Sequence, residues 1–108
     1  MSRLNLEDSK LYDPTIFNGL KFGLQFQTLA AAYTMDRDAP VLQFLDPGGA
    51  GRTVNLPPEE RGLCFIIINR ADAAEDLTIK EDSSTTTIGV ISQDELAILV
   101  CDGTTWNI

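Results

Sequence analysis

The stretch that decides the fold runs from Asp46 to Asn69 and reads DPGGAGRTVNLPPEERGLCFIIIN. Pro47 fixes one φ angle and the glycines after it are free to take positive φ, so the stretch begins as a tight turn. The Pro57-Pro58 pair cannot donate hydrogen bonds to a sheet, so the short strand before it must end there. The apolar run that follows is typical of a buried strand. We therefore expect a compact β framework, and we expect no catalytic group within this stretch.

Short β-prone runs separated by turn residues continue beyond this stretch. From Thr28 onward their spacing is typical of a sandwich or a barrel. The Asp102-Gly103 pair predicts a tight hairpin turn, whereas residues 70–76 fit either a loop or a single helical turn. The strands are expected near residues 28–35, 41–45, 52–56, 63–69, 76–80, 86–91, 96–101 and 104–107.

The apolar pattern distinguishes two kinds of strand. Side chains that alternate onto one face predict half-buried strands, with Leu77 and Ile79 pointing inward in one strand. In another strand the inward set is Leu29, Ala31, Tyr33 and Met35. The runs 62–69 and 95–101 are instead continuously apolar, which suits central strands that are covered on both faces. We expect the second sheet to cover one face, and a neighbouring subunit or the N-terminal segment to cover the other.

Residues 1–27 differ from the rest of the chain. They are polar at first and then alternate apolar and polar residues, while Pro14 and the Asn18-Gly19 pair interrupt any helix. This composition predicts an extended N-terminal arm, residues 1–27, ahead of a domain of residues 28–108. The arm has apolar surface to bury but too little to form a core alone, so we expect it to pack on its own domain or on another chain.

Length and charge limit the classes of function. A chain of 108 residues fits one domain, and its 44% of hydrophobic residues predict that most of it folds. The formal net charge of −8 repels phosphate backbones and anionic lipids, so neither nucleic acid nor a membrane is an expected partner. The N-terminus lacks the pattern of a secretory signal, and the longest apolar run, residues 63–68, is too short to span a bilayer. We expect a protein that is made and used in the cytoplasm or in something assembled there.

The two cysteines lie in apolar, strand-like runs. Cys64 and Cys101 lack the close spacing of a redox or zinc motif. Two buried free thiols are the favoured interpretation, and a disulfide between adjacent strands stays open.

The search for catalytic chemistry yields no site. The chain has no histidine, which removes the usual general base and every Ser-His or Cys-His pair. The carboxylate pairs Glu59-Glu60 and Asp94-Glu95 are adjacent in sequence, so structural or solubilising roles are favoured over glycoside hydrolysis. We predict that the protein is not an enzyme, and we assign no catalytic, cofactor-binding or metal residues.

Several binding motifs were weighed against structural roles. The glycines before Arg52 lack the Gly-Lys-Ser/Thr ending of a phosphate loop, so a turn is favoured over capture of an anion. Residues 81–84 and the Asp36–Asp38 segment lack the spacing of a calcium loop, so solvated loops are favoured there. Trp106 is expected to close the core, although a carbohydrate-stacking platform is the alternative.

Six pieces of sequence occur in an order that resembles a known class of protein. They include a Leu-Asp-Pro-Gly turn and a terminal Asp-Gly-Thr-x-Trp hairpin, and they stand at Leu45 to Gly48, Val54 to Pro57, Gly62 to Asn69, Leu77 to Ile79, Thr87 to Ile91 and Asp102 to Trp106. In this order they resemble small structural proteins of tailed bacteriophages, especially head decoration (cement) proteins and related modules of virion fibres. The resemblance covers residues 28–108 or so.

The resemblance implies a single small antiparallel β-sandwich, jelly-roll-like, that oligomerises on the outer capsid surface. Such a protein is a non-enzymatic virion structural protein that stabilises the head by bridging major capsid proteins. The expected partners are the major capsid protein and further copies of the chain, as a trimer or a dimer, with no small-molecule substrate and no cofactor. The expected location is the capsid exterior of a virion assembled in the host cytoplasm.

The N-terminal arm lies outside this resemblance, and we infer its role from its composition. We expect it to contact the capsid or another subunit through Leu4, Leu6, Tyr12, Phe17, Leu20, Phe22, Leu24 and Phe26. The alternative function for the whole chain is a receptor- or glycan-binding module of a phage tail fibre or spike.

Overall fold

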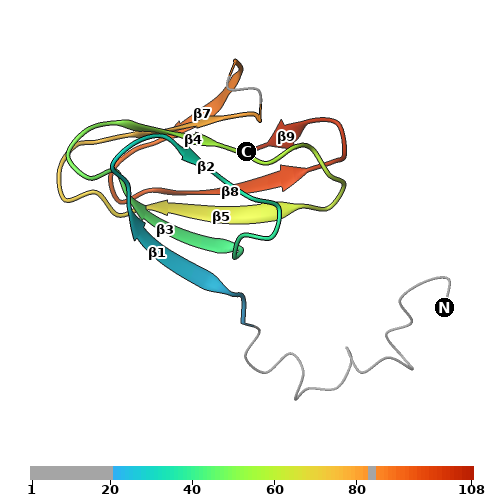
Figure 1. Ribbon diagram of the computed structural model, residues 1–108, viewed down its shortest axis with the longest axis horizontal. Helices are drawn as coiled ribbons and strands as arrows, with labels where there is room; N and C mark the ends of the chain where they lie inside the picture. Colours follow the sequence, from blue (N-terminus) through green and yellow to red (C-terminus); the bar gives the residue numbers. More distant parts are fainter. Residues whose placement is uncertain (1–20, 83–84) are drawn as a thin grey trace, which may run out of the picture.

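The computed structural model describes residues 21–82 and 85–108. These residues form nine strands and no helix (Figure 1). The predicted all-β fold is confirmed. The strands are β1 (Leu24–Thr28), β2 (Tyr33–Thr34), β3 (Leu42–Asp46), β4 (Arg52–Asn55), β5 (Cys64–Asn69), β6 (Leu77–Lys80), β7 (Thr87–Ile91), β8 (Leu96–Cys101) and β9 (Trp106–Asn107).

The chain winds back and forth between two mixed sheets. The five-stranded sheet has the order β1-β3-β5-β8-β9, and the four-stranded sheet has the order β2-β4-β6-β7. Successive strands up to β6 alternate between the sheets, so β1, β3 and β5 run parallel, as do β2, β4 and β6. The expected antiparallel, jelly-roll-like pairing is therefore wrong for these six strands. We call one strand in each sheet, with the connections that join them, a coil of the chain. After one complete coil the chain returns to the first sheet, so the next strand there runs in the same direction as the strand before it. The last three strands are added antiparallel, because β7 pairs with β6, β8 with β5 and β9 with β8.

The first two coils stack the same tripeptide in register. Leu24-Gln25-Phe26 of β1 lies beside Leu42-Gln43-Phe44 of β3, residue against identical residue. The two phenylalanine rings stack with their centroids 4.6 Å apart and their planes inclined by 20°. Residues 24–27, which the sequence analysis placed in the arm, thus belong to the five-stranded sheet. Residues 1–20 of the predicted arm lie outside the described residues.

The inner faces of the two sheets share one hydrophobic core. The five-stranded sheet contributes Leu45, Phe65, Ile67 and Leu99, and the four-stranded sheet contributes Val54, Leu77, Ile79 and Ile91. The predicted inward positions of Leu77 and Ile79 are confirmed, since both are fully buried. Trp106 is 3% exposed and donates its indole N–H to the Pro57 carbonyl at 3.1 Å, so it closes the core as expected.

The predicted strand over residues 28–35 is broken into two. Leu29 and Met35 are buried as expected, but Ala31 is exposed because the chain bends between β1 and β2. Residues 70–76 form a loop and not a helical turn.

The glycine-rich segment forms the predicted turn between β3 and β4. Gly48 and Gly49 have φ angles of 77° and 101°, which side-chain-bearing residues rarely adopt. A Cβ atom on Gly48 would also lie 2.2 Å from the carbonyl oxygen of Leu29. Arg52 donates from Nε to the Pro47 carbonyl at 2.8 Å, so its guanidinium closes the turn.

The two cysteines lie on neighbouring strands but face opposite ways. Cys64 pairs with Val100 across β5 and β8, and its side chain points to the outer face of the sheet. Cys101, the next residue of β8, points into the core. Both thiols are free, as predicted, although only Cys101 is buried.

A buried amide holds the end of β5 to two other segments. Asn69 is fully buried, and its Nδ2 donates to the carbonyls of Glu75 at 2.8 Å and Ile91 at 2.9 Å. Its Oδ1 accepts the backbone N–H of Ala71 at 2.8 Å. One side chain thereby joins β5, the loop that follows it and the end of β7.

We expect Asn69→Ala to lower the free energy of unfolding by about 3 kcal/mol, because it leaves the carbonyls of Glu75 and Ile91 and the N–H of Ala71 without their partner. Urea unfolding at neutral pH measures the loss. The matched control is Asn107→Ala at an exposed position, where we expect a loss below about 0.5 kcal/mol. Equal losses in the two variants would contradict the assigned role of Asn69.

The hairpin between β8 and β9 is held by a carboxylate. Asp102 accepts the backbone N–H groups of Thr105 at 2.8 Å and Thr104 at 2.9 Å, and Gly103 supplies a φ of 99°. The predicted hairpin is confirmed. The hydrogen bond from Thr105, followed by that from Thr104, lowers the pKa of Asp102 below its ordinary value of 3.8.

A lowered pKa means that the ionised carboxylate stabilises the folded state. This stabilisation is present above pH 3.8 and is lost as the pH falls through the lower folded-state pKa. We expect Asp102→Ala to be less stable than the natural chain at neutral pH, with a difference that shrinks as the pH falls below 3.8. Chemical unfolding of both proteins across this range tests the expectation, and a difference that stays constant or grows would contradict it.

Candidate interaction surface

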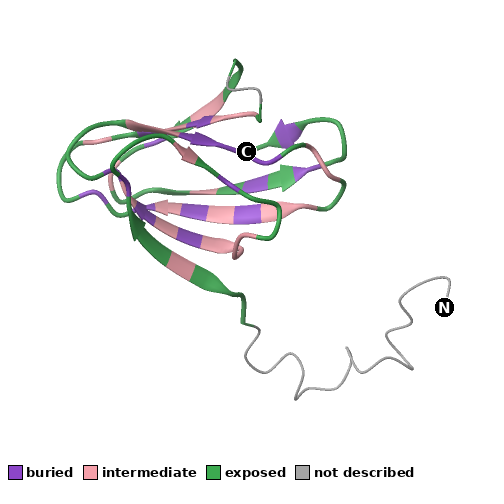
Figure 2. Cartoon of the chain, in the orientation of Figure 1, coloured by how far each residue is buried: buried purple, intermediate pink, exposed green. Residues whose placement is uncertain are grey.

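The outer face of the five-stranded sheet is apolar across four strands. Side chains alternate along a strand, so every residue between two core positions points outward. Figure 2 shows this alternation along β3 and β5. We call the outward set the apolar face; it consists of Leu24, Phe26, Leu42, Phe44, Cys64, Ile66, Ile68, Leu96, Ile98 and Val100.

The register arranges these side chains in rows across the sheet. Leu24, Leu42, Ile66 and Ile98 form one row, and Phe26, Phe44, Ile68 and Leu96 form the next. Exposure is greatest on the two flanking strands. On β1, Leu24 is 51% and Phe26 66% exposed; on β8, Leu96 is 59% and Ile98 53% exposed.

Two stacked aromatic rings lie at one corner of this face. Phe26 lies against Phe44, and the guanidinium carbon of Arg70 is 5.9 Å and 5.8 Å from the two ring centroids. Attraction between the cation and the rings favours this arrangement. The two rings and Arg70 therefore form one corner of the apolar face.

The outer face of the four-stranded sheet is polar by comparison. Its outward positions include Thr34, Thr53, Thr78, Lys80 and Thr87, which alternate with core residues. Val90 is a large apolar side chain exposed on this side, at 51%. The two outer faces thus differ in character, and the one with the contiguous apolar area is the candidate interaction surface.

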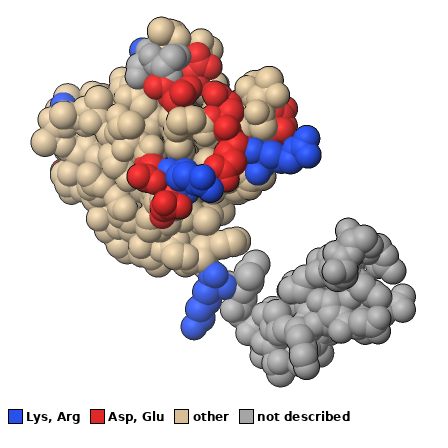
Figure 3. All heavy atoms as spheres, turned by 45° about the vertical axis from the view of Figure 1, so that its right-hand side comes forward, with Lys and Arg blue, Asp and Glu red and all other residues tan. Residues whose placement is uncertain are grey.

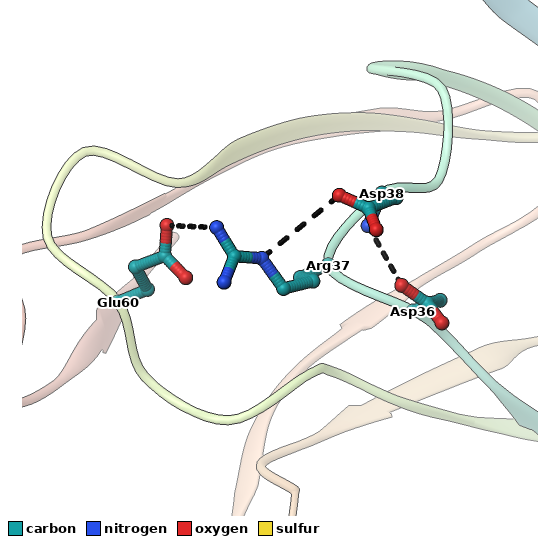
Figure 4. A network of polar contacts seen from close by, with 4 residues as sticks. All are labelled: Asp36, Arg37, Asp38 and Glu60. Carbon is teal, nitrogen blue, oxygen red and sulfur yellow. Dashed lines mark hydrogen bonds and ion pairs between the residues drawn. The ribbon is translucent and has the colours of Figure 1, made fainter.

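Charged side chains gather in one part of the surface seen in Figure 3, where acidic and basic groups lie close together. One such group surrounds a hollow of ≈ 410 Å³ lined by Met35, Pro57, Pro58 and neighbouring residues. Figure 4 shows its polar contacts. Arg37 donates to Glu60 Oε2 at 2.9 Å, and Asp36 Oδ1 accepts the backbone N–H of Asp38 at 2.8 Å. The acids considered for calcium here are bound to their own loop and to Arg37.

Three carboxylates that the sequence did not single out come together beside the glycine turn. Oxygen atoms of Asp46, Asp72 and Glu75 lie within 4.8 Å of one another. Asp46 accepts the N–H of Gly48 at 2.9 Å, and Glu75 accepts the N–H of Gly49 at 3.2 Å. These contacts give two of the three acids a role in holding the turn. Their separation in sequence, 26 residues from Asp46 to Asp72, explains why no motif revealed the group.

One member of each carboxylate pair considered for catalysis has a structural partner. Glu60 is paired with Arg37, and Glu95 Oε1 accepts the backbone N–H of Ser92 at 3.0 Å. Asp94 adopts a φ of 64° in the turn before β8. Glu60, Asp94 and Glu95 therefore each have a structural role in a loop or turn.

The predicted contact residues fall into two groups. Leu24 and Phe26 belong to the apolar face, and Phe22, just before β1, is 46% exposed. Leu4, Leu6, Tyr12, Phe17 and Leu20 lie outside the described residues. A cover for the outer side of β5 and β8, by a neighbouring subunit or the N-terminal segment, was expected from the sequence, but the outward residues of β3 were not among the predicted contacts. The uninterrupted apolar runs of β5 and β8 were the sequence feature that indicated outward apolar residues in these two strands.

None of the described elements is a helix long and apolar enough to cross a membrane. Comparison with protein-family models, curated proteins and solved structures found no match for this chain.

Proposed function

We propose that this chain is a non-enzymatic structural protein of a phage virion, bound to the outside of the capsid and bridging major capsid proteins. In this proposal the two sheets act together as a compact β-sandwich. The observation that carries it is the contrast between the apolar face and the polar outer face of the other sheet. Such a contrast suits a subunit that has one side in an assembly and the other in solvent.

The N-terminal edge of the sheet offers a second contact region. Phe22 is exposed just before β1, outside the apolar face, and it continues the alternating apolar pattern of the preceding residues. Apolar side chains on an edge strand can dock on a partner while the backbone of that strand adds hydrogen bonds. This supports capsid contact through the arm.

Many copies on one particle make weak individual contacts sufficient. Each copy that touches two neighbouring capsid proteins links them, and association with further copies raises the effective concentration of every contact. The acidic chain, with a net charge of −8, gives no support for nucleic acid as the partner.

The test begins with the genome that encodes this chain, where a major capsid gene beside its own gene is expected, and continues with binding to heads assembled from that capsid protein. We expect the full chain to sediment with such heads and Phe22→Ala to bind them at least about 10-fold more weakly. The control is Ile108→Ala, at a position 58% exposed near the other end of the chain, which should bind as the natural chain does. No binding by the natural chain would overturn the proposal.

A specific hollow favours the alternative, a glycan-binding module of a tail fibre or spike. Trp106 is buried and offers no platform, but Phe26 lines an open hollow of ≈ 210 Å³ together with Thr28, Asp46 and Arg70. An aromatic ring beside hydrogen-bonding side chains is an arrangement that can hold a sugar. Glycan-array binding that Phe26→Ala abolishes would favour this alternative, as would tail genes beside the gene of this chain.

A further inference from the structure

We propose that two copies of this chain associate by packing their apolar faces together. This deepens the proposed function, on which it rests for its place in an assembly, by naming the partner of the apolar face. The occupant is a second copy of the chain, packed sheet against sheet.

Charge favours a second copy at this face. The chain carries 16 acidic and 8 basic residues, so two copies repel each other over most of their surface. None of the ten side chains of the apolar face is charged. At its margin stand Asp46 and Arg70, which have opposite signs and add no net repulsion. The apolar face is thus a surface on which two acidic molecules can meet.

The shape of the face fits a copy of itself. Two β-sheets pack face to face about 10 Å apart when outward side chains interdigitate, as the inner faces of the two sheets already do in this protein. The stacked rings of Phe26 and Phe44 add aromatic surface to this face at the corner near Arg70. A two-fold axis in the interface brings the same rows of Leu, Ile and Phe together from both molecules.

The size of the face matches the core of such an interface. Four strands about 4.8 Å apart, each with five residues rising about 3.3 Å, give a projected area on the order of 300 Å². Protruding side chains raise the accessible area above this projection. A typical interface buries about 800 Å² on each partner, with an apolar centre and a polar rim. The apolar face therefore supplies the centre, and the surrounding loops supply the rim.

The chain contains a matched pair of positions for the test. Val100 on the apolar face is 43% exposed, and Val90 on the opposite outer face is 51% exposed. Sedimentation velocity of the full-length natural chain over a concentration series should show a monomer–dimer equilibrium. Val100→Lys should weaken the dimer at least about 10-fold by placing an unpaired charge in the interface, whereas Val90→Lys should leave it unchanged.

The reactivity of the Cys64 thiol provides a second, independent measurement of the same interface. Its side chain lies on the apolar face, while Cys101 is 1% exposed in the core. Reaction of the Cys64 thiol with an aromatic disulfide reagent should slow as the natural protein dimerises. In Ile98→Lys, with unchanged circular dichroism, the reaction should stay fast at every concentration.

A natural chain that stays monomeric up to about 0.1 mM would overturn the proposal, because such a Kd is too weak for specific pairing. Equal effects of Val100→Lys and Val90→Lys would overturn it too, since the effect would then not belong to the apolar face. The measurements need no capsid. Loss of capsid binding with an intact dimer would refute only the proposed function, and a monomer that binds capsids would refute only this inference.

Discussion

The buried amide of Asn69 is the contact on which the arrangement of coils depends. It ends β5, yet it binds the loop after that strand and the last residue of β7 in the other sheet. A parallel winding has no hairpin turn to set the register between neighbouring strands, and a buried polar side chain helps to set it. Because this amide is fully buried, moving it would leave its hydrogen-bonding groups and their partners without each other and without water. This energetic penalty favours one position of β5 relative to the loop that follows it and to the end of β7.

The winding also decides where the surfaces lie. Each coil contributes one strand to each sheet, so the outward residues of successive coils line up in rows across a whole face. Leucine and phenylalanine in the first coil are followed by leucine and phenylalanine in the second and by isoleucine in the third. Threonine occupies many of the matching positions of the other sheet. A difference that is small in any one strand thus becomes a difference between two sides of the molecule.

Much of this architecture follows from local sequence. The glycine turn, the Asp102-Gly103 hairpin and the inward positions of Leu77 and Ile79 depend on backbone freedom and on alternation, both of which a short segment displays. Strand direction was predicted wrongly because pairing joins residues far apart, such as Leu24 and Leu42, and no local pattern distinguishes parallel from antiparallel neighbours. For the candidate surface, the apolar runs of β5 and β8 indicated a covered outer face. Only the register showed that Phe44 and Leu42 extend that face to β1.

The matching tripeptides of β1 and β3 bear on how such a chain can change its length. Leu24-Gln25-Phe26 and Leu42-Gln43-Phe44 occupy equivalent places 18 residues apart, as copies of one ancestral segment would. Duplication of a complete coil adds one strand to each sheet and keeps every side chain on the same face of its sheet, inward or outward. A strand that gains a single residue has its later side chains turned over. Descendants of this chain should therefore differ in size by whole coils, with smaller insertions confined to the turns.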